Sequence, residues 1–384
     1  MTEALQEPER NPERELEFVD DEGSAAVAWQ QLPPEREFFA TPYDPPVKTL
    51  VQEIQEKDLN VRPSFQRYSV WDVVRQSRFV ESLLLNIPIP TLFFAEDDDK
   101  TKVVVDGQQR LLAIKEFLEN QYALTGLEVL AALNGKRFHE LTGRQQKLLR
   151  NRTIRCLVIS ARSDSEIRFQ VFERLNQGGV PLNAQEVRHC VYRGPFNDLL
   201  HKLAEKKLFQ QLLGLNDRHP RMNDCELALR FFAIRSSLPR YSPPLKTLLN
   251  SCMRATRYAG PEQCLELETA FDMSIRAVAA VFSDLPFRRV FRLPDGGIAA
   301  DRSLNRAVFD AQTIVMEGLD TKWAGANREA VKAAFTSLCL DDQVFADSVS
   351  RATADKARLE YRLGRWRDAL LRLGAVLPAE GRIP

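Results

Sequence analysis

The amino-acid sequence predicts an α+β protein, with a mixed α/β domain at residues 42–195 and an all-helical domain at residues 196–384. Two observations predict this arrangement. The three segments that best fit β-strands all lie before residue 160. From about residue 196 onward, apolar residues recur at helical spacing and strand signals nearly vanish. The composition, 44% hydrophobic and 28% charged, is that of a globular protein long enough to bury a sizeable core.

Residues 1–41 are predicted to be an acidic leader rich in Glu and Pro. Residues 1–40 carry eleven acidic and three basic side chains, and because the chain has 53 of each, the remainder has eight more bases than acids. Such a composition is typical of a solvated, disordered tail. The alternative is a tail that shields a basic site. The net charge of zero gives by itself no argument for a nucleic-acid or membrane partner.

Apolar spacing, caps and prolines define the elements of the first half, where order is expected from about Tyr43. Asp72 suits the N-cap of a helix, and Pro88 and Pro90 stop that helix. An acidic hairpin loop at residues 97–100 joins two strands. The predicted elements are a helix over 47–56, an extended segment over 60–68, a helix over 72–85, strands over 91–95 and 101–105, a helix over 108–119, a strand over 154–159, a helix over 165–175 and a helix beginning at Asn183.

The second half contains almost only helical patterns. Residues 286–301 are the exception and read as a loop or a small hairpin. The predicted helices lie near residues 197–213, 223–238, 262–282, 303–317, 326–338 and 355–373.

A buried-strand pattern followed by a sharp turn and a helix forms the first candidate site. Gly107 permits a close approach of the backbone, and the start of the following helix favours an anion. Arg110 offers a fork suited to phosphate, while Gln108 and Gln109 suit a base edge, a sugar hydroxyl or a water. The spacing of Asp106 and Gln109 also fits a capping box, with Asp106 as the N-cap. The two interpretations are compatible.

A second polar stretch, residues 62–72, is rich in arginine and aromatic side chains. Arg67 beside Tyr68 and Trp71 suits a charge next to a stacking surface. The alternative is that these aromatic residues, with Phe65, anchor the core and that Arg67 is a surface charge.

A third stretch, residues 172–186, joins two predicted helices through Asn176, Gly178 and Gly179. A polar, flexible joint of this kind often borders a ligand. A helix–turn–helix joint needs no ligand, however, and Asn183 with Glu186 fits a capping box that starts the next helix.

Several other classes of site are excluded by pattern. The four histidines fit no HxH, HExxH or nuclease spacing, and the chain has no GxxxxGK[ST], GxGxxG or serine nucleophile elbow. The six cysteines form no CxxC pair, so free, buried thiols are expected. No run of eighteen apolar residues and no signal-peptide pattern is present, so we expect a cytoplasmic protein without membrane contact.

Four stretches occur in this order along the chain: FQR…W, ESLLLNIPIP, VDGQQRLLAI and FERLNQGGVPLNAQEVR. Through these stretches the chain resembles the GmrSD-type family, which is named for the N-terminal half of a two-part modification-dependent restriction system. The resemblance is strong over residues 43–200 and weaker in residues 305–309 and 362–366. It implies a fold related to ParB and sulfiredoxin, with a helical extension. Related full-length effectors add a C-terminal HNH nuclease, whose His/Asn pattern this chain lacks.

The resemblance also implies a nucleotide site. The DGQQR turn would bind and hydrolyse a nucleoside triphosphate with Mg²⁺, with Asp106 or Glu81 near the ion. The residues that the resemblance assigns to catalysis are Asp106, Gln108, Gln109 and Arg110, and those assigned to nucleotide binding are Arg67, Gly107, Arg110, Arg174, Asn176 and Gly179.

Three functions remain open at this point. The first is a nucleoside triphosphatase of a restriction or phage-defence system, which couples its nucleotide state to DNA or to a separate nuclease subunit. The second is a non-catalytic, ParB-like protein that binds DNA or senses modified DNA. The third is a helical scaffold whose signature motifs are structural caps. The sequence leaves the nucleotide base and the oligomeric state open.

Overall fold

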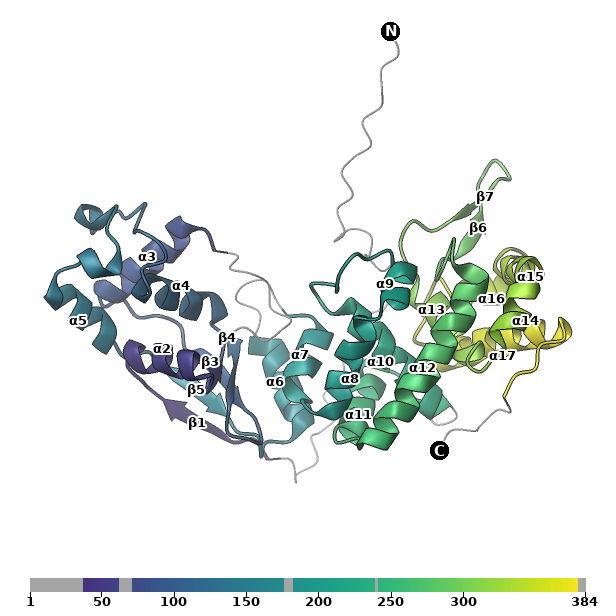
Figure 1. Cartoon of the computed structure of the whole chain (residues 1–384), viewed down its shortest axis with the longest axis horizontal. Coiled ribbons are helices and arrows are strands. Elements are labelled where there is room, and N and C mark those ends of the chain that lie inside the picture. The colour runs from purple at the N-terminus through teal and green to yellow at the C-terminus, as the bar shows by residue number, and fades with distance from the viewer. Residues whose placement is uncertain (1–36, 62–70, 176–181, 239–240, 379–384) are drawn as a thin grey trace, which may run out of the picture. The chain divides into compact units, whose positions relative to one another are not determined.

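The computed structural model describes residues 37–61, 71–175, 182–238 and 241–378 (Figure 1). Its internal contacts divide the chain into two compact units. One spans Gln31–Arg193, and the other contains Gly194–Pro384. The first is a mixed α+β unit with a small sheet and the second is mostly helical, as the sequence predicts. None of the helices described here is long and apolar enough to cross a lipid bilayer.

A five-stranded mixed sheet is the centre of the first unit. Its strand order is β1 (Ala40–Tyr43), β5 (Cys156–Ile159), β3 (Leu92–Glu96), β4 (Lys102–Asp106) and β2 (Leu59–Asn60). β3 runs parallel to β5 and antiparallel to β4. The amide of Asp97 donates to the carbonyl of Thr101 at 2.8 Å, which closes the predicted hairpin between β3 and β4.

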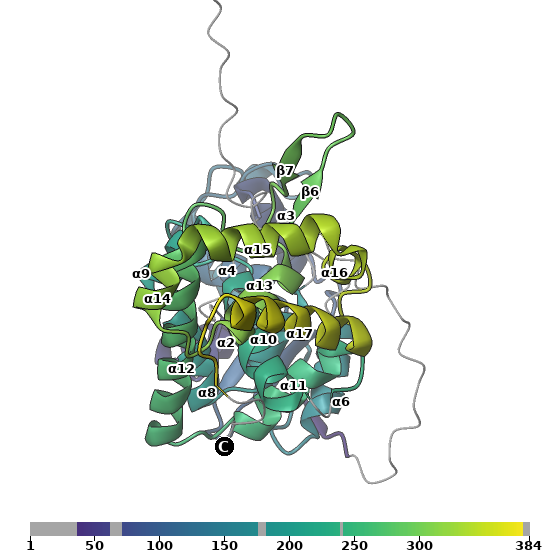
Figure 2. The ribbon, with the colours of Figure 1, turned by 90° about the vertical axis from the view of Figure 1, so that its right-hand side faces the viewer.

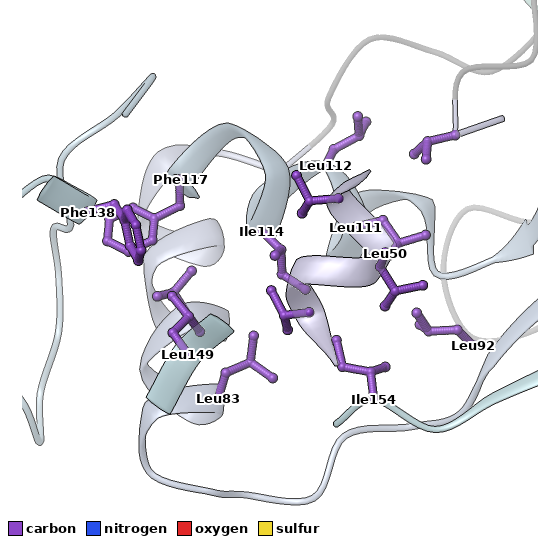
Figure 3. Close-up of a cluster of buried hydrophobic side chains, with 14 of the residues drawn as sticks. Leu50, Leu83, Leu92, Leu111, Leu112, Ile114, Phe117, Phe138, Leu149 and Ile154 are labelled. Atoms are coloured by element: carbon purple, nitrogen blue, oxygen red, sulfur yellow. The ribbon is translucent and has the colours of Figure 1, made fainter. Parts of the chain in front are cut away.

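Helices cover the sheet because its strands alternate between two buried sets of side chains. One set includes Phe94 and Val104, which share a core with α2 (Val47–Glu56), α3 (Val73–Leu84), α4 (Gln108–Leu118) and α5 (Gly143–Asn151). Figure 3 shows this core, in which Leu50 lies close to Leu111 and Phe117 lies beside Phe138. Each such side chain contributes about 1.5–3 kcal/mol by leaving water.

The alternate residues of β4, Val103 and Val105, are buried on the opposite face. The helix α6 (Ser165–Leu175) packs against β4, and α7 (Ala184–Val191) packs against α6. Phe169 and Phe172 of α6 are almost fully buried. The sheet is therefore covered on both faces.

Side-chain caps start two of the predicted helices where the sequence places them. The Asp72 carboxylate accepts from the amide of Arg75 at 2.7 Å. Asn183 and Glu186 form the predicted capping box, in which each side chain bonds the other residue's amide. A further capping box starts α5, which the sequence analysis did not predict.

The helical unit contains more breaks than the sequence predicts (Figure 2). The single helix expected over 197–213 is two helices, the predicted helix over 326–338 is preceded by a separate short one, and the hairpin reading of residues 286–301 is correct. Its elements are α8 (Pro195–Ala204), α9 (Lys207–Leu213), α10 (Asn223–Ser237), α11 (Leu245–Thr256), α12 (Pro261–Phe282), β6 (Val290–Arg292), β7 (Ile298–Ala300), α13 (Arg306–Val315), α14 (Thr321–Ala326), α15 (Arg328–Asp341), α16 (Gln343–Ser348) and α17 (Lys356–Arg372).

Aromatic side chains fill the core of this unit. Trp366 of α17 is completely buried and lies edge-on to Phe335 of α15, with 5.0 Å between the ring centroids. Phe282 of α12 completes the group at 6.2 Å from Trp366. All six cysteines of the chain are free thiols, as predicted, although Cys252 and Cys264 are only partly buried.

Two arginines share one carboxylate inside the helical unit. Arg230 of α10 donates to both oxygens of Asp310 on α13, at 3.1 and 2.7 Å. Arg362 of α17 donates to the same carboxylate at 3.2 Å and to two backbone carbonyls. All three side chains are at most 2% exposed. The carboxylate therefore joins three helices and compensates two buried positive charges.

We expect Asp310→Asn to destabilise the chain by about 3–5 kcal/mol, because it leaves buried arginines without their counter-charge. Glu317→Gln is the matched control, since the pair between Arg235 and Glu317 is more exposed and its loss costs about 1 kcal/mol or less. Urea unfolding followed by circular dichroism measures both. Equal losses in the two variants would show that the buried carboxylate has no special role.

Candidate functional site

The turn after β4 requires a glycine for two independent reasons. Gly107 has φ 102° and ψ 9°, in the left-handed region, and it is the N-cap of α4. A Cβ atom added at Gly107 would lie 2.3 Å from Cδ2 of Leu92, inside the core. Strand β4 and helix α4 are therefore joined at a point where no side chain fits.

The structure corrects the expected capping box at this turn. Asp106 is the last residue of β4 rather than the N-cap, and α4 has no side-chain cap. The Asp106 carboxylate instead accepts from Nη2 of Arg110 at 2.5 Å. The spacing of Asp106 and Gln109 was misleading because the carboxylate turns toward the next turn of the helix.

Arg110 is held firmly at this turn. Besides Asp106, its guanidinium bonds the carbonyl of Pro90, just before β3, at 2.6 Å. The Arg110 side chain is 12% exposed and that of Asp106 is 33% exposed. Arg110 thus ties the start of α4 to both central strands, and its remaining N–H groups have a fixed direction.

Gln109 brings the second motif to the first. Its side-chain oxygen accepts from the backbone amide of Trp71 at 3.3 Å, which fixes the residues before α3 beside the start of α4. The Trp71 ring packs edge-on against Phe79 at 5.7 Å and lies under the guanidinium of Arg75 at 4.7 Å. Arg75, which the sequence does not single out, is thus a cation beside the Trp71 ring. Arg67 lies outside the described residues.

Gln108 carries one of several buried polar atoms that lack a hydrogen-bond partner within the described residues, as does Gln312 in the helical unit. Its side-chain nitrogen is buried, and within the described part of the chain it has no hydrogen-bond partner. A buried amide donor without a partner costs about 1–3 kcal/mol, so such atoms are rare and call for an explanation. A bound acceptor, such as a phosphate oxygen, supplies one.

Topology places the third motif at the same end of the sheet. α6 follows β5 after a short connection and packs back against β4, so it runs antiparallel to β5. β5 is parallel to β3 and β4 is antiparallel to both, so α6 ends near the Asp106 end of β4. α6 and β4 are each about 16 Å long, which agrees with this placement.

The last turn of α6 exposes Glu173 and Arg174. Arg174 therefore lies on the element that reaches the Asp106 end of the sheet. Asn176 and Gly179 lie outside the described residues.

The Glu81 carboxylate, which the sequence analysis expects near a Mg²⁺ ion, has one oxygen bonded to backbone amides. The Glu81 side chain is 7% exposed, and its Oε1 accepts from the backbone amides of Val129 and Leu130 at 3.0 and 2.7 Å. Its carboxylate therefore holds the loop that follows α4. Within the described residues, no three or more His, Cys, Asp or Glu side chains gather in a group that could hold a metal ion.

One other cluster has the residue types of a catalytic pair. His201 Nδ1 lies 3.6 Å from Sγ of Cys225 and contacts Arg218. Burial raises the pKa of the Cys225 thiol well above its ordinary value, and burial with Arg218 lowers the pKa of His201 to about 4. A neutral thiol beside a weakly basic imidazole is a poor nucleophile, so this pair belongs to the core.

Residues 47–193 match the family model described as GmrSD restriction endonuclease, N-terminal domain. The match confirms the resemblance over this range, which contains the Gly107 turn and all of α3, α4 and α6. Comparison with curated proteins and with solved structures finds no match. The relation to ParB and sulfiredoxin therefore stays a prediction.

We expect Gly107→Ala to lower the free energy of unfolding by about 2–4 kcal/mol, through backbone strain and overlap with Leu92. Gly135→Ala separates the two causes, because Gly135 has φ 84° but no atom within 4 Å of an added Cβ. This control should cost only about 1 kcal/mol. Urea unfolding measures both variants, and equal costs would contradict the role of Leu92.

The free energy of unfolding should decrease as the pH is lowered, because His201 has a lowered pKa in the folded chain. The unfolded histidine gains a proton near its ordinary pKa, about 6.5, whereas the folded one gains it only near 4, so acid favours unfolding in this interval. Between pH 7 and 4.5 the wild type should lose about 2–3 kcal/mol more than His201→Gln. Urea titrations of both proteins at the two pH values test this, and parallel losses would refute it.

Proposed function

We propose, from the GmrSD N-terminal domain at residues 47–193, that this chain is a restriction or phage-defence component that binds and hydrolyses a nucleoside triphosphate at the Gly107 turn. The observation that carries the proposal is the buried amide of Gln108. It is a hydrogen-bond donor without a partner in the described chain, at the start of a helix without a side-chain cap.

The start of α4 suits phosphate on physical grounds. The first N–H groups of a helix lack partners within the helix, and the helix dipole adds partial positive charge there. Gly107 lets the backbone enter the helix without a Cβ in the way. The Gln108 amide adds a neutral donor from the same turn, so in the proposal both groups bind phosphate oxygens.

Arg110 acts in this proposal on the nucleotide itself, through spare donors. Its contacts with Asp106 and Pro90 use one N–H on each terminal nitrogen, and a guanidinium has five. The others stabilise negative charge that develops during hydrolysis. Because the side chain is already held, little entropy is lost when a phosphate binds.

The remaining residues of the proposed site rest on the family resemblance. Gln109 accepts a hydrogen bond from the amide of Trp71, and Arg67 lies outside the described residues. Arg174 lies in the last turn of α6, and Asn176 and Gly179 follow it in the sequence, outside the described residues. The proposal assigns these residues to the nucleotide.

A magnesium ion fits the site only together with the nucleotide. Asp106 supplies the carboxylate of the turn, and this carboxylate accepts a hydrogen bond from Arg110. Mg²⁺ is commonly held by one or two carboxylates and the phosphates of its substrate. Asp106 would hold the ion, which when bound would neutralise charge on the phosphates.

A non-catalytic DNA-binding protein is the alternative function. The pairing of Arg110 with Asp106 favours it, because an arginine already neutralised is less useful to a phosphate. Under this alternative the DGQQR turn is a structural joint, and DNA binds without any nucleotide turnover.

Gln108→Leu tests the proposal, because it removes the donor and keeps the size of the side chain. We expect nucleotide affinity to fall about 10–100-fold, the value of one hydrogen bond to a charged group. The stability of the free protein should stay unchanged or rise, since a buried unpartnered amide is removed. Titration of labelled GTP, ATP and CTP, with urea unfolding, measures both effects.

Gln52→Leu is the matched control, since Gln52 lies on the exposed side of α2 and bonds Glu56. It should leave nucleotide affinity unchanged. Failure of the wild-type protein to bind any of the three nucleotides contradicts the proposal. Salt-dependent DNA binding without turnover would then favour the alternative.

A further inference from the structure

A basic surface surrounds α5, and none of the sequence motifs accounts for it. Residues 141–163 contain six basic side chains and no acidic one, in a chain with equal numbers of both. The basic face is defined here as the cationic side chains on α5 and beside its two ends: Lys136, Arg137, Arg144, Lys147, Arg150 and Arg152.

The helix presents part of this face directly to water. Arg144 and Lys147 are exposed and stand three positions apart, so they lie on the same side of α5. Leu149 points the other way and is fully buried in the core. The core contact thus orients α5 so that its charged side faces outward.

Neutral groups hold the other arginines in place. The guanidinium of Arg150 lies 5.0 Å from the centre of the Phe138 ring. Arg137 donates to the carbonyl of Asn120, and Arg152 to the carbonyl of Ile87 at 3.5 Å. These contacts limit the motion of the side chains without cancelling their charge.

Cations without counter-charges gather on this surface. Among the described residues, none of the six cations of the basic face forms an ion pair. Exposed bases elsewhere are commonly paired, such as Arg78 with Glu128 and Lys202 with Glu268. The one acid close by in sequence, Glu140, bonds the backbone amide of Arg137.

We propose that the basic face binds the phosphate backbone of double-stranded DNA. Unpaired, exposed Lys and Arg on a helix and its flanks are the groups that replace counterions along a duplex. Such contacts position a protein on DNA without reading bases. The proposal rests on the proposed function, which assigns the chain to a restriction system. For that reason we expect the bound polyanion to be DNA.

The test is a salt titration of the full-length protein with a fluorescent 30-base-pair duplex. Arg144→Gln/Lys147→Gln removes two charges from the basic face. If both side chains contact phosphates, the slope of log K for DNA binding against the logarithm of the salt concentration becomes less steep by about 1.8. At 0.1 M salt the variant should bind at least about tenfold more weakly. Lys207→Gln/Lys322→Gln, two exposed lysines of the helical unit, gives the same change in net charge and should bind like the wild type.

Three outcomes overturn the proposal. They are wild-type affinity in the α5 variant, equal weakening in both double variants, and tighter binding of duplex RNA than of duplex DNA. Nucleotide titrations on the same proteins keep this test separate from the nucleotide site. An α5 variant that loses DNA but keeps nucleotide supports the basic face, whatever Gln108→Leu shows. Circular dichroism confirms that the exposed substitutions leave the fold intact.

Discussion

The contact between Gly107 and Leu92 is the constraint on which the first unit depends. Strand β4 ends against the side chain of a neighbouring strand, so the chain continues only through a residue without a Cβ in the left-handed region. Helix α4 then starts at once, and Arg110 reaches back from its first turn to Asp106 and Pro90. The start of this helix is thereby fixed relative to the two central strands.

This fixed turn places polar groups at the edge of a hydrophobic core. Leu111 and Leu112 follow the glutamines directly and are almost fully buried. The amide of Gln108 is buried with them, although Gln109 finds a partner in the backbone of Trp71. A buried donor without a partner persists when the surrounding packing holds it, and such strain gathers at functional sites. If the turn binds phosphate as proposed, these donors are already in place before the nucleotide arrives.

Local patterns in the sequence predicted much of this fold because local forces decide it. The bounds of α2 and α6 agree with the prediction, since apolar spacing and flanking turn residues determine where a helix lies. The caps at Asp72 and Asn183 were also predicted correctly, because each bond spans three residues. The mixed α+β unit followed by a helical one is confirmed for the same reason.

Local patterns did not predict contacts between residues that are far apart in the sequence. Nothing local indicates that Arg110 bonds Pro90, twenty positions earlier, or that Asp106 turns away from Gln109. The helix break after α8 was missed because the apolar pattern continues across it, and α11 was missed altogether. The orphaned Gln108 amide exists only in the folded chain. The basic face, by contrast, had a readable signal in the acid-free run over residues 141–163, which whole-chain charge counting conceals.

Two groups of described arginines differ in how their charges are compensated, and this difference explains why net charge gives so little information. Arg110, Arg230 and Arg362 are removed from water and paired with carboxylates, so their charges act within the fold. Those around α5 are held by rings and carbonyls, which leave the charge to act outward. Equal totals of acids and bases conceal this difference, because the field at a surface depends on which charges are cancelled nearby. The proposed contact with DNA therefore follows from the pairing pattern of these arginines rather than from the sum of the charges.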